Sequence, residues 1–260
     1  MKVIILCGGL GTRLREETEF RPKPMVPIGD RPILWHIMKI YAHYGHKEFI
    51  LCLGYKGEII REYFRNYHWN TSNTTLNLGS KPKIQYHDHH HEEDWKVTLV
   101  ETGPDSLTGK RLRQIEPFLG RDQEFFLTYG DGVGNVDIQA AFRFHKKHRR
   151  LVTLTAVHPP GRFGEIKMNL KNRVEQFNEK PQTEAGWING GFFVLSRGVF
   201  RYIPAGENVL FEQQPLKRMT GEGQVMAYAH DGFWQPMDTY REFEMLNRMW
   251  SEGKAPWKIW

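Results

Sequence analysis

A glycine-rich loop near the start of the sequence carries residues suited to binding phosphate. The apolar run Val3–Cys7 is followed at once by the string GGLGTR, residues 8–13. Glycines let the main chain approach a polyanion closely, and successive free N–H groups then form an anion-binding concavity next to a helix start. Arg13, and Lys23 in the string PKP, would add charge-assisted contacts. The loop therefore predicts a phosphate site made of backbone N–H groups and two cations.

Two common nucleotide-binding motifs do not match this loop. Its GGxG spacing differs from the GxGxxG of dinucleotide-binding domains, and it lacks the GKS or GKT of a P-loop. A simple dehydrogenase and a P-loop ATPase are therefore excluded. On the GGxG string alone, a plain turn with Lys23 as a solvated surface charge explains the residues equally well.

Asp131 is a candidate metal ligand. It follows the apolar run Glu124–Tyr129 with one glycine between, so it would lie at the carboxyl edge of a parallel sheet, where ligands bind in open α/β folds. Carboxylates combined with phosphate oxygens and waters suit Mg²⁺. Taken alone, however, an Asp between two glycines is more often a turn residue.

The first half of the chain alternates apolar runs with amphipathic stretches, which is typical of βαβ units around a largely parallel sheet. Asp30 would cap a helix with Pro32 in its first turn, and further helices are expected at Glu58–Tyr67 and Val136–His148. Residues 68–82, rich in Asn and Thr, are expected to be loop. We expect strands at Val3–Cys7, Glu48–Leu53, Lys83–His87 and Glu124–Tyr129.

The pattern changes after Leu151. Five strand-like segments precede a last helix at Tyr240–Ser251, and they predict antiparallel strands that cover the parallel core. Because neither an internal repeat nor a Pro/Ser-rich linker occurs, residues 1–260 are expected to form one domain. Three C-terminal tryptophans fit an interface or packing on the chain's own core; they are Trp250, Trp257 and Trp260. The five strand-like segments after Leu151 are Leu151–Val157, Glu165–Met168, Arg173–Asn178, Trp187–Leu195 and Gln224–His230.

Charge and composition restrict the class of protein. The 36 Lys and Arg against 30 Asp and Glu give a formal charge of +6, and 40% of residues are hydrophobic, which is enough for a packed core. The basic residues are scattered, so nucleic acid is not an expected partner. No run approaches the roughly 20 apolar residues of a membrane span, so we expect a cytoplasmic protein without a membrane partner. Cys7 and Cys52 are expected as buried thiols and not as a disulfide.

The full opening string, GGLGTRLREETEFRPKPMVPIGDRPIL, resembles the signature of sugar-1-phosphate nucleotidyltransferases. Motifs along nearly the whole chain resemble members of that family that use CTP and glucose 1-phosphate. These motifs are TLVETG (98–103), SLTGKRL (106–112), YGDGV (129–133), PPGRFG (159–164), INGGFF (188–193) and GFWQPMDT (232–239).

This resemblance implies a Rossmann-like α/β nucleotidyltransferase fold, with a mostly parallel central sheet, helices on both faces and added antiparallel strands in the C-terminal half. It implies transfer of CMP from CTP to alpha-D-glucose 1-phosphate, giving CDP-glucose and pyrophosphate for deoxysugar or O-antigen-type glycans such as those of lipopolysaccharide. It also implies Mg²⁺ as cofactor and a homo-oligomer, either a trimer or a hexamer.

The resemblance assigns roles to individual residues. Asp131 and Asp238 would be the metal ligands, and Arg13, Lys23 and Lys180 the catalytic cations. Lys180, in the string EKP, would hold the sugar phosphate, with Asn189 and Gly190 near the sugar. An exposed cation is the alternative for Arg111. The nucleotide would be bound by Leu6, Gly8, Gly9, Gly11, Thr12, Arg13, Lys23, Ser106, Arg111 and Gly130, with the backbone of residues 6–9 beside the cytosine.

One residue of the loop departs from the family pattern. Cys7 stands where relatives commonly have Ala, and it would pack as a small apolar group and not act as a nucleophile. The stretch His87–Asp94 is expected to be a mobile polar loop near the substrate cleft and not a zinc site, because adjacent residues do not present a spaced tetrahedral ligand set. The acceptor could instead be another sugar phosphate or a different phosphorylated or phosphonylated molecule. A non-catalytic nucleotide-sugar sensor on the same fold is the second alternative.

Overall fold

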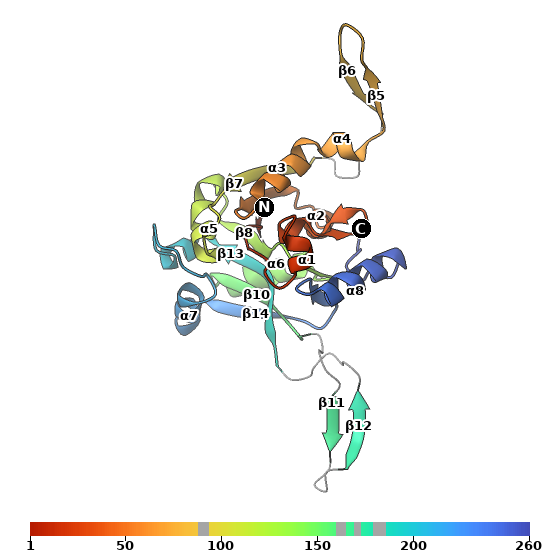
Figure 1. Ribbon diagram of the computed structural model, residues 1–260. Coiled ribbons are helices and arrows are strands. Elements are labelled where there is room, and N and C mark those ends of the chain that lie inside the picture. Colours follow the sequence, from red (N-terminus) through yellow and green to blue (C-terminus); the bar gives the residue numbers. More distant parts are fainter. Residues whose placement is uncertain (88–93, 160–164, 169–172, 179–185) are drawn as a thin grey trace.

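A seven-stranded sheet forms the centre of the molecule (Figure 1). The computed structural model describes residues 1–87, 94–159, 165–168, 173–178 and 186–260. The strand order is β14-β10-β13-β8-β1-β4-β7. β1 pairs in parallel with both β4 and β8, and β4 pairs in parallel with β7, so the predicted parallel half is confirmed. The strands are β1 (Lys2–Leu6), β4 (Glu48–Leu53), β7 (Lys96–Glu101), β8 (Glu124–Tyr129), β10 (Val152–Val157), β13 (Ile188–Ser196) and β14 (Val225–His230).

The strands of the second half extend this sheet and do not cover it. β13 runs antiparallel to both β8 and β10, and β14 runs parallel to β10. The predicted antiparallel strands are therefore present, but their predicted place over the parallel core is wrong. The open edge of β8 offers unpaired N–H and C=O groups that β13 satisfies, whereas helices occupy both faces of the sheet. β11 (Glu165–Met168) and β12 (Val174–Asn178) form a separate antiparallel hairpin (Figure 1).

Alternate residues of each strand fill two cores, one on each face of the sheet. In β1, Val3 and Ile5 belong to one buried cluster, and Ile4 and Leu6 belong to the other. Helices α2 (Ile33–His43), α6 (Ile138–His148) and α8 (Tyr240–Ser251) contribute to the first cluster. Helices α5 (Thr108–Gln114) and α7 (Gln214–Gly221) contribute to the second. The sheet thus has helices on both faces, as the resemblance implied.

The helix starts depend on caps that the sequence only partly predicts. α2 begins at Ile33 behind Pro32, and no side chain caps it, so the prediction that Asp30 caps this helix is wrong. The reason is a short ladder that keeps the preceding residues extended, in which β3 (Arg31–Pro32) pairs with β2 (Pro27–Ile28). In α6, the Asp137 side chain accepts a hydrogen bond from the N–H of Ala140, so this helix begins two residues later than predicted.

The structure contains elements that the sequence patterns did not predict. The strand β7 was missed, and so were α5 and α7, because short helices with few apolar residues show little periodicity. Residues 68–82 are not all loop, because most of α4 (Tyr67–Thr71) and all of β5 (Thr74–Asn77) fall there. β5 pairs with β6 (Lys83–Tyr86) in a hairpin that projects from the body (Figure 1). The remaining elements are α1 (Arg15–Thr18), η1 (Lys23–Met25), α3 (Gly57–Arg65), η2 (Glu116–Leu119), β9 (Gly132–Gly134), η3 (Arg197–Tyr202) and β15 (Trp234–Pro236).

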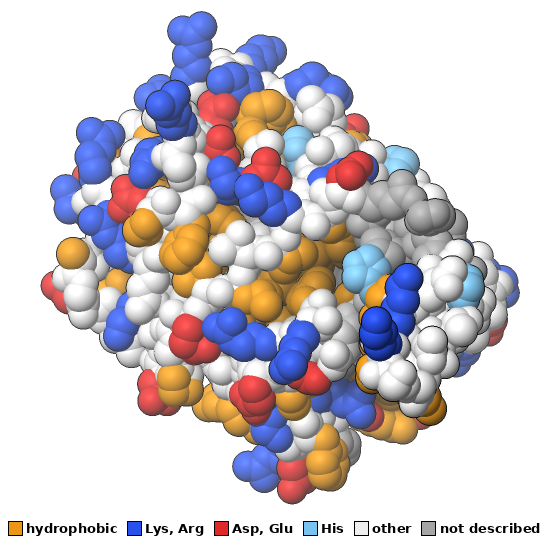
Figure 2. All heavy atoms as spheres, turned by 90° about the horizontal axis from the view of Figure 1, so that it is seen from above, with side chains coloured by type: hydrophobic (Ala, Val, Ile, Leu, Met, Phe, Trp, Pro, Cys, Tyr) orange, Lys and Arg blue, Asp and Glu red, His pale blue; other side chains and the backbone are white. Residues whose placement is uncertain are grey.

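The two cysteines agree with the prediction made from composition, and one face of the surface carries mixed charges. Lys and Arg side chains are spread among Asp and Glu over the face shown in Figure 2 and do not gather in one stripe. Cys7 and Cys52 are free and buried. Within the part of the chain that the structure describes, no helix has the length and apolar character needed to cross a bilayer.

The C-terminal segment packs against α2. Trp257 is fully buried, and its indole N–H donates to Nδ1 of His36 over 3.4 Å. Nε2 of His36 lies 3.0 Å from the carbonyl oxygen of Ile28, so this nitrogen carries the proton of the neutral ring. Trp250 and Trp260 also contact the His36 ring. Trp257 therefore belongs to the chain's own core, and Trp250 and Trp260, which are half-buried, pack against it.

Candidate active site

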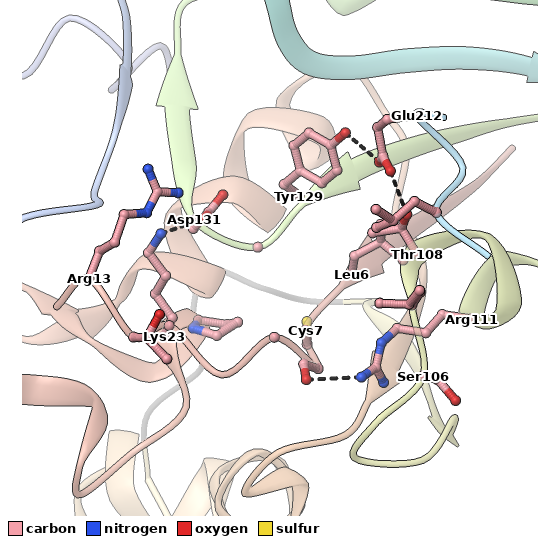
Figure 3. Close-up of a pocket in the computed structure, with 18 residues that line it drawn as sticks. Leu6, Cys7, Arg13, Lys23, Ser106, Thr108, Arg111, Tyr129, Asp131 and Glu212 are labelled. Atoms are coloured by element: carbon pink, nitrogen blue, oxygen red, sulfur yellow. Dashed lines mark hydrogen bonds and ion pairs between the residues drawn. The ribbon is translucent and has the colours of Figure 1, made fainter. Parts of the chain in front are cut away.

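A cavity of about 520 Å³ lies at the carboxyl ends of β1 and β8 (Figure 3). Every residue predicted to bind the nucleotide lines it, so the structure gathers these residues from distant parts of the sequence. Figure 3 shows Arg13, Lys23 and Asp131 at one end and Ser106 and Arg111 at the other. The lining residues are Leu6, Cys7, Gly8, Gly9, Gly11, Thr12, Arg13, Lys23, Pro24, Ser106, Leu107, Thr108, Arg111, Tyr129, Gly130, Asp131, Leu210 and Glu212.

Lys23 lies between the two predicted metal ligands. It begins the short helix η1, and its side chain is only 10% exposed. Its Nζ lies 2.7 Å from a carboxylate oxygen of Asp131 and contacts a carboxylate oxygen of Asp238. Burial alone would lower the pKa of Lys23, but the charges and hydrogen bonds of the two carboxylates raise it above the ordinary value of lysine. Lys23 is therefore protonated throughout the physiological pH range.

A two-stranded ladder brings together carboxylates that are far apart in the sequence. Asp131 directly precedes β9, and β9 pairs antiparallel with β15, so that Gly132 lies opposite Pro236. The N–H of Met237 then donates to the carbonyl oxygen of Asp131 over 2.8 Å. The next residue is Asp238, whose side chain thereby reaches the same cation as Asp131.

Asp238 is also held by the start of α8. A carboxylate oxygen of Glu242 accepts hydrogen bonds from the N–H groups of Asp238 and Thr239, over 2.7 and 2.8 Å. In return, the hydroxyl of Thr239 accepts from the N–H of Glu242, which completes a capping box. The other carboxylate oxygen of Asp238 lies 2.8 Å from the guanidinium of Arg13.

Arg111 is buried beside the cavity, so its alternative as an exposed cation is wrong. A Cβ on Gly8 would lie 2.1 Å from its guanidinium, and a Cβ on Gly54 would lie 2.5 Å from it. A side chain at either position would therefore force the Arg111 guanidinium to move. Its guanidinium donates to protein oxygens of Gly8, Leu53, Thr102 and Pro104, over 3.0, 2.8, 2.6 and 3.1 Å.

These contacts assign Arg111 a role that the sequence did not predict. The guanidinium joins the glycine-rich loop to the last residue of β4 and to the segment that follows β7. Because four of its bonds go to the protein, Arg111 fixes the shape of the pocket. Its predicted contact with the nucleotide stays a prediction.

Glu212 is a further residue of the cavity that the sequence patterns missed. Its two carboxylate oxygens accept hydrogen bonds from the hydroxyls of Tyr129 and Thr108, over 2.6 and 2.5 Å (Figure 3). Burial, together with the charge of Glu212, raises the pKa of Tyr129 far above its ordinary value, so this hydroxyl remains a donor. Glu212 lies in an irregular segment without a motif, and only its place in the fold identifies it.

The predicted sugar-phosphate site is only partly described. Lys180 lies outside the described residues. Asn189 and Gly190 are not among the described residues that line the cavity, but Asn189 contacts Tyr129, which does line it. The amide of Asn189 donates to the Tyr129 hydroxyl over 3.4 Å, and the carbonyl oxygen of Gly190 accepts from the indole N–H of Trp234 over 2.7 Å.

The chain is similar in sequence and in fold to known proteins. The model of the family described as nucleotidyl transferase matches residues 2–250. The chain belongs to this nucleotidyl transferase family. A solved structure of HddC from Yersinia pseudotuberculosis, complexed with GMP-PN, has a TM-score of 0.69 at 21% identity and covers 96% of this chain and 99% of its own, which shows the same fold.

Two characteristic relatives of this nucleotidyltransferase differ in how similar they are to it. The glucose-1-phosphate cytidylyltransferase of Salmonella typhimurium is 49% identical over 260 residues, which is 100% of both chains. The mannose-1-phosphate guanyltransferase of Aspergillus fumigatus is 28% identical over 252 residues, which is 94% of this chain and 62% of that one.

The carboxylates of this nucleotidyltransferase fit a hard divalent cation. Asp131 and Asp238 already converge on one positive charge, and two carboxylates completed by phosphate oxygens and waters are typical of Mg²⁺. Among the described residues, no group of three or more His, Cys, Asp or Glu side chains could hold a metal.

Of the predicted polar loop His87–Asp94, residues 88–93 lie outside the described part. His87 itself directly follows β6, and its Nε2 lies 2.7 Å from the hydroxyl oxygen of Thr75.

Cys7 lines the cavity of the nucleotidyltransferase but is not suited to covalent catalysis. Burial raises its pKa well above the ordinary value, and burial raises that of Cys52 to about 12. A nucleophilic cysteine needs a thiolate, and both thiols stay protonated near neutral pH. This agrees with the expectation that Cys7 packs as a small apolar group.

Proposed function

We propose that this chain transfers CMP from CTP to alpha-D-glucose 1-phosphate, producing CDP-glucose and pyrophosphate. One observation carries the proposal. Lys23, Asp131 and Asp238 converge at a glycine-lined cavity in a chain that is 49% identical, over its full length, to a glucose-1-phosphate cytidylyltransferase. The product would be a precursor of deoxysugars in O-antigen-type glycans, including those of lipopolysaccharide.

The reaction needs no protein base. A phosphate oxygen of glucose 1-phosphate attacks the α-phosphorus of CTP, a new P–O bond forms, and the bond between the α-phosphorus and the bridging oxygen to the β-phosphorus breaks as pyrophosphate leaves. The second pKa of a phosphomonoester is about 6, so the nucleophile is already a dianion at neutral pH. The obstacle is the approach of two anions, and catalysis must come from positioning and charge neutralisation.

Both effects can come from the chain's own cations. Lys23 and Arg13, at one end of the cavity, would stabilise the α-phosphate and the departing pyrophosphate. Lys180, which lies outside the described residues, would orient the nucleophile. Asp131 and Asp238 would hold Mg²⁺, which neutralises phosphate charge when bound. The backbone of residues 6–9 lines the same cavity and would border the cytosine. We also propose that the enzyme works in the cytoplasm as a trimer or hexamer.

The test is pyrophosphate release with Mg²⁺ and glucose 1-phosphate, compared across CTP, UTP, dTTP, ATP and GTP. We expect turnover with CTP to exceed turnover with the other nucleotides, and we expect it to vanish when EDTA replaces Mg²⁺. Silence with every nucleotide would contradict the proposal. If the protein then still bound CTP, other phosphorylated acceptors would be tested first. A role as a nucleotide-sugar sensor would be tested second.

A further inference from the structure

Two carboxylates and two cations of the chain form one compact charge cluster at the cavity. Asp131 and Asp238 share the ammonium group of Lys23, and Asp238 also pairs with Arg13. Two negative charges therefore face two positive charges. The carboxylates that fit a divalent cation are already neutralised by the chain itself.

Burial makes Lys23 the dominant member of this cluster. The side chains of Lys23 and Asp238 are each 10% exposed, whereas the side chain of Arg13 is 66% exposed. Solvent screens the Arg13 pair strongly and the Lys23 contacts weakly. A divalent cation that approaches the two carboxylates would therefore meet the charge of Lys23 at close range.

We propose that Lys23 is an exchangeable counter-ion, which holds Asp131 and Asp238 until the nucleotide arrives and then moves to its phosphates. This inference rests on the proposed function. The triphosphate offers Lys23 and Arg13 new anionic partners, and the carboxylates are then released to a metal. Metal and nucleotide consequently bind with positive coupling, because each removes a cost from the binding of the other.

A simpler role for Lys23 leads to the opposite expectation. If Lys23 only braced the two carboxylates in a geometry suited to metal, removing its charge would weaken metal binding. If Lys23 competes with the metal, removing its charge leaves two uncompensated carboxylates and strengthens metal binding. The sign of one measured change therefore separates a brace from a counter-ion.

The experiment is an electron paramagnetic resonance titration of the protein with Mn²⁺, which counts free Mn²⁺ without any turnover. Without nucleotide, we expect Lys23→Met to bind Mn²⁺ roughly tenfold or more tightly than the wild type. Lys23→Arg, which keeps the charge, should bind it as weakly as the wild type. After subtraction of the Mn²⁺ that CTP chelates without protein, addition of CTP should tighten Mn²⁺ binding by the wild type much more than by Lys23→Met.

Matched variants make the outcome specific. Lys146→Met removes a lysine that pairs with Glu124 on the surface, and it should change Mn²⁺ affinity by less than roughly twofold. Adding Asp238→Asn to Lys23→Met should abolish the gain. Mn²⁺ affinity of folded Lys23→Met equal to or below that of the wild type would overturn the inference. If instead that affinity rises while the wild type releases no pyrophosphate with any nucleotide, the proposed function fails, and only the competition between Lys23 and the metal for the two carboxylates stands.

Discussion

Two neighbouring glycines of the loop after β1 differ in what surrounds them. A Cβ on Gly8 would meet the Arg111 guanidinium at 2.1 Å, whereas a Cβ on Gly9 would meet nothing within 4 Å. We expect Gly8→Ala to destabilise the protein by about 1–3 kcal/mol, because it overpacks a buried site. Gly9→Ala should leave stability unchanged and weaken CTP binding by roughly tenfold or more, because it blocks the approach of phosphate to the backbone.

Thermal unfolding and calorimetric titration with CTP separate these two effects. Gly54→Ala is a matched control for Gly8→Ala. The new Cβ would overlap the same Arg111 guanidinium, but position 54 lies outside the glycine-rich loop. Unchanged CTP affinity in Gly9→Ala would show that this part of the backbone does not approach the nucleotide.

Lys23 is also the residue whose loss should slow the reaction most directly. We expect Lys23→Ala to lower kcat on the order of a hundredfold or more, as removal of one transition-state donor typically does. Steady-state pyrophosphate release under saturating CTP and glucose 1-phosphate gives the value, with Lys146→Ala as the surface control. A raised KM with unchanged kcat would refute the role, because that pattern reports only uniform binding.

At this scale, residue type and order predicted the cations and carboxylates but not their mutual contacts. Gly8, Lys23 and Asp131 belong to the short sequence motifs GGLGTR, PKP and YGDGV, which can be recognised in the sequence. The contact of Lys23 with Asp238, the hydrogen bond of Arg111 to Gly8 and that of Tyr129 to Glu212 join residues 215, 103 and 83 positions apart. No local pattern encodes such contacts.

At the scale of elements, the β9–β15 ladder and the start of α8 position the carboxylates. We expect Glu242→Ala to cost about 1 kcal/mol of stability, because the N–H groups of Asp238 and Thr239 lose their common acceptor. It should also raise the Mg²⁺ concentration needed for half-maximal activity several-fold, since Asp238 is then less well held. Urea unfolding and Mg²⁺ titrations of activity measure the two effects.

The exposed Glu244 of α8 supplies the control for this prediction. Glu244→Ala should change neither quantity. An unaltered Mg²⁺ requirement in Glu242→Ala would mean that the cap supports the helix alone and not the position of Asp238.

Elements with strong periodicity were predictable, and those determined by long-range pairing were not. The buried strands β4 and β8 and the amphipathic helix α8 have the predicted boundaries. The place of β13 in the sheet depends instead on the open edge of β8, about sixty residues earlier in the sequence. The helix α5, with Leu112 as its one aliphatic residue, is stabilised mainly by its contacts with other segments.

At the scale of the whole molecule, His36 links α2 to the C-terminal segment and makes stability depend on pH. Burial lowers the pKa of His36 from 6.5 to about 4. Below pH 6.5 the unfolded chain therefore takes up a proton that the folded chain refuses until about pH 4. Stability should fall as the pH decreases through this window, and by pH 5 this residue should account for about 2 kcal/mol.

Guanidinium unfolding at pH 7.5 and pH 5.0, followed by tryptophan fluorescence, tests this link. His36→Gln keeps a donor and an acceptor but does not titrate, so its loss of stability over the same interval should be smaller. Equal losses in both proteins would assign the pH dependence to other groups, such as His46 and His145, whose pKa values burial also lowers to about 4.

The ladder that joins Asp131 to Asp238 also has a consequence for biosynthesis. A nascent chain that has been made as far as Gly232 contains the glycine-rich loop, Lys23 and Asp131, but it lacks Asp238 and the helix that holds it. Such a chain can begin to fold its parallel strands during translation. It cannot present the paired carboxylates to a metal, so a ribosome-bound intermediate would not consume nucleotide before Asp238 and α8 have been synthesised.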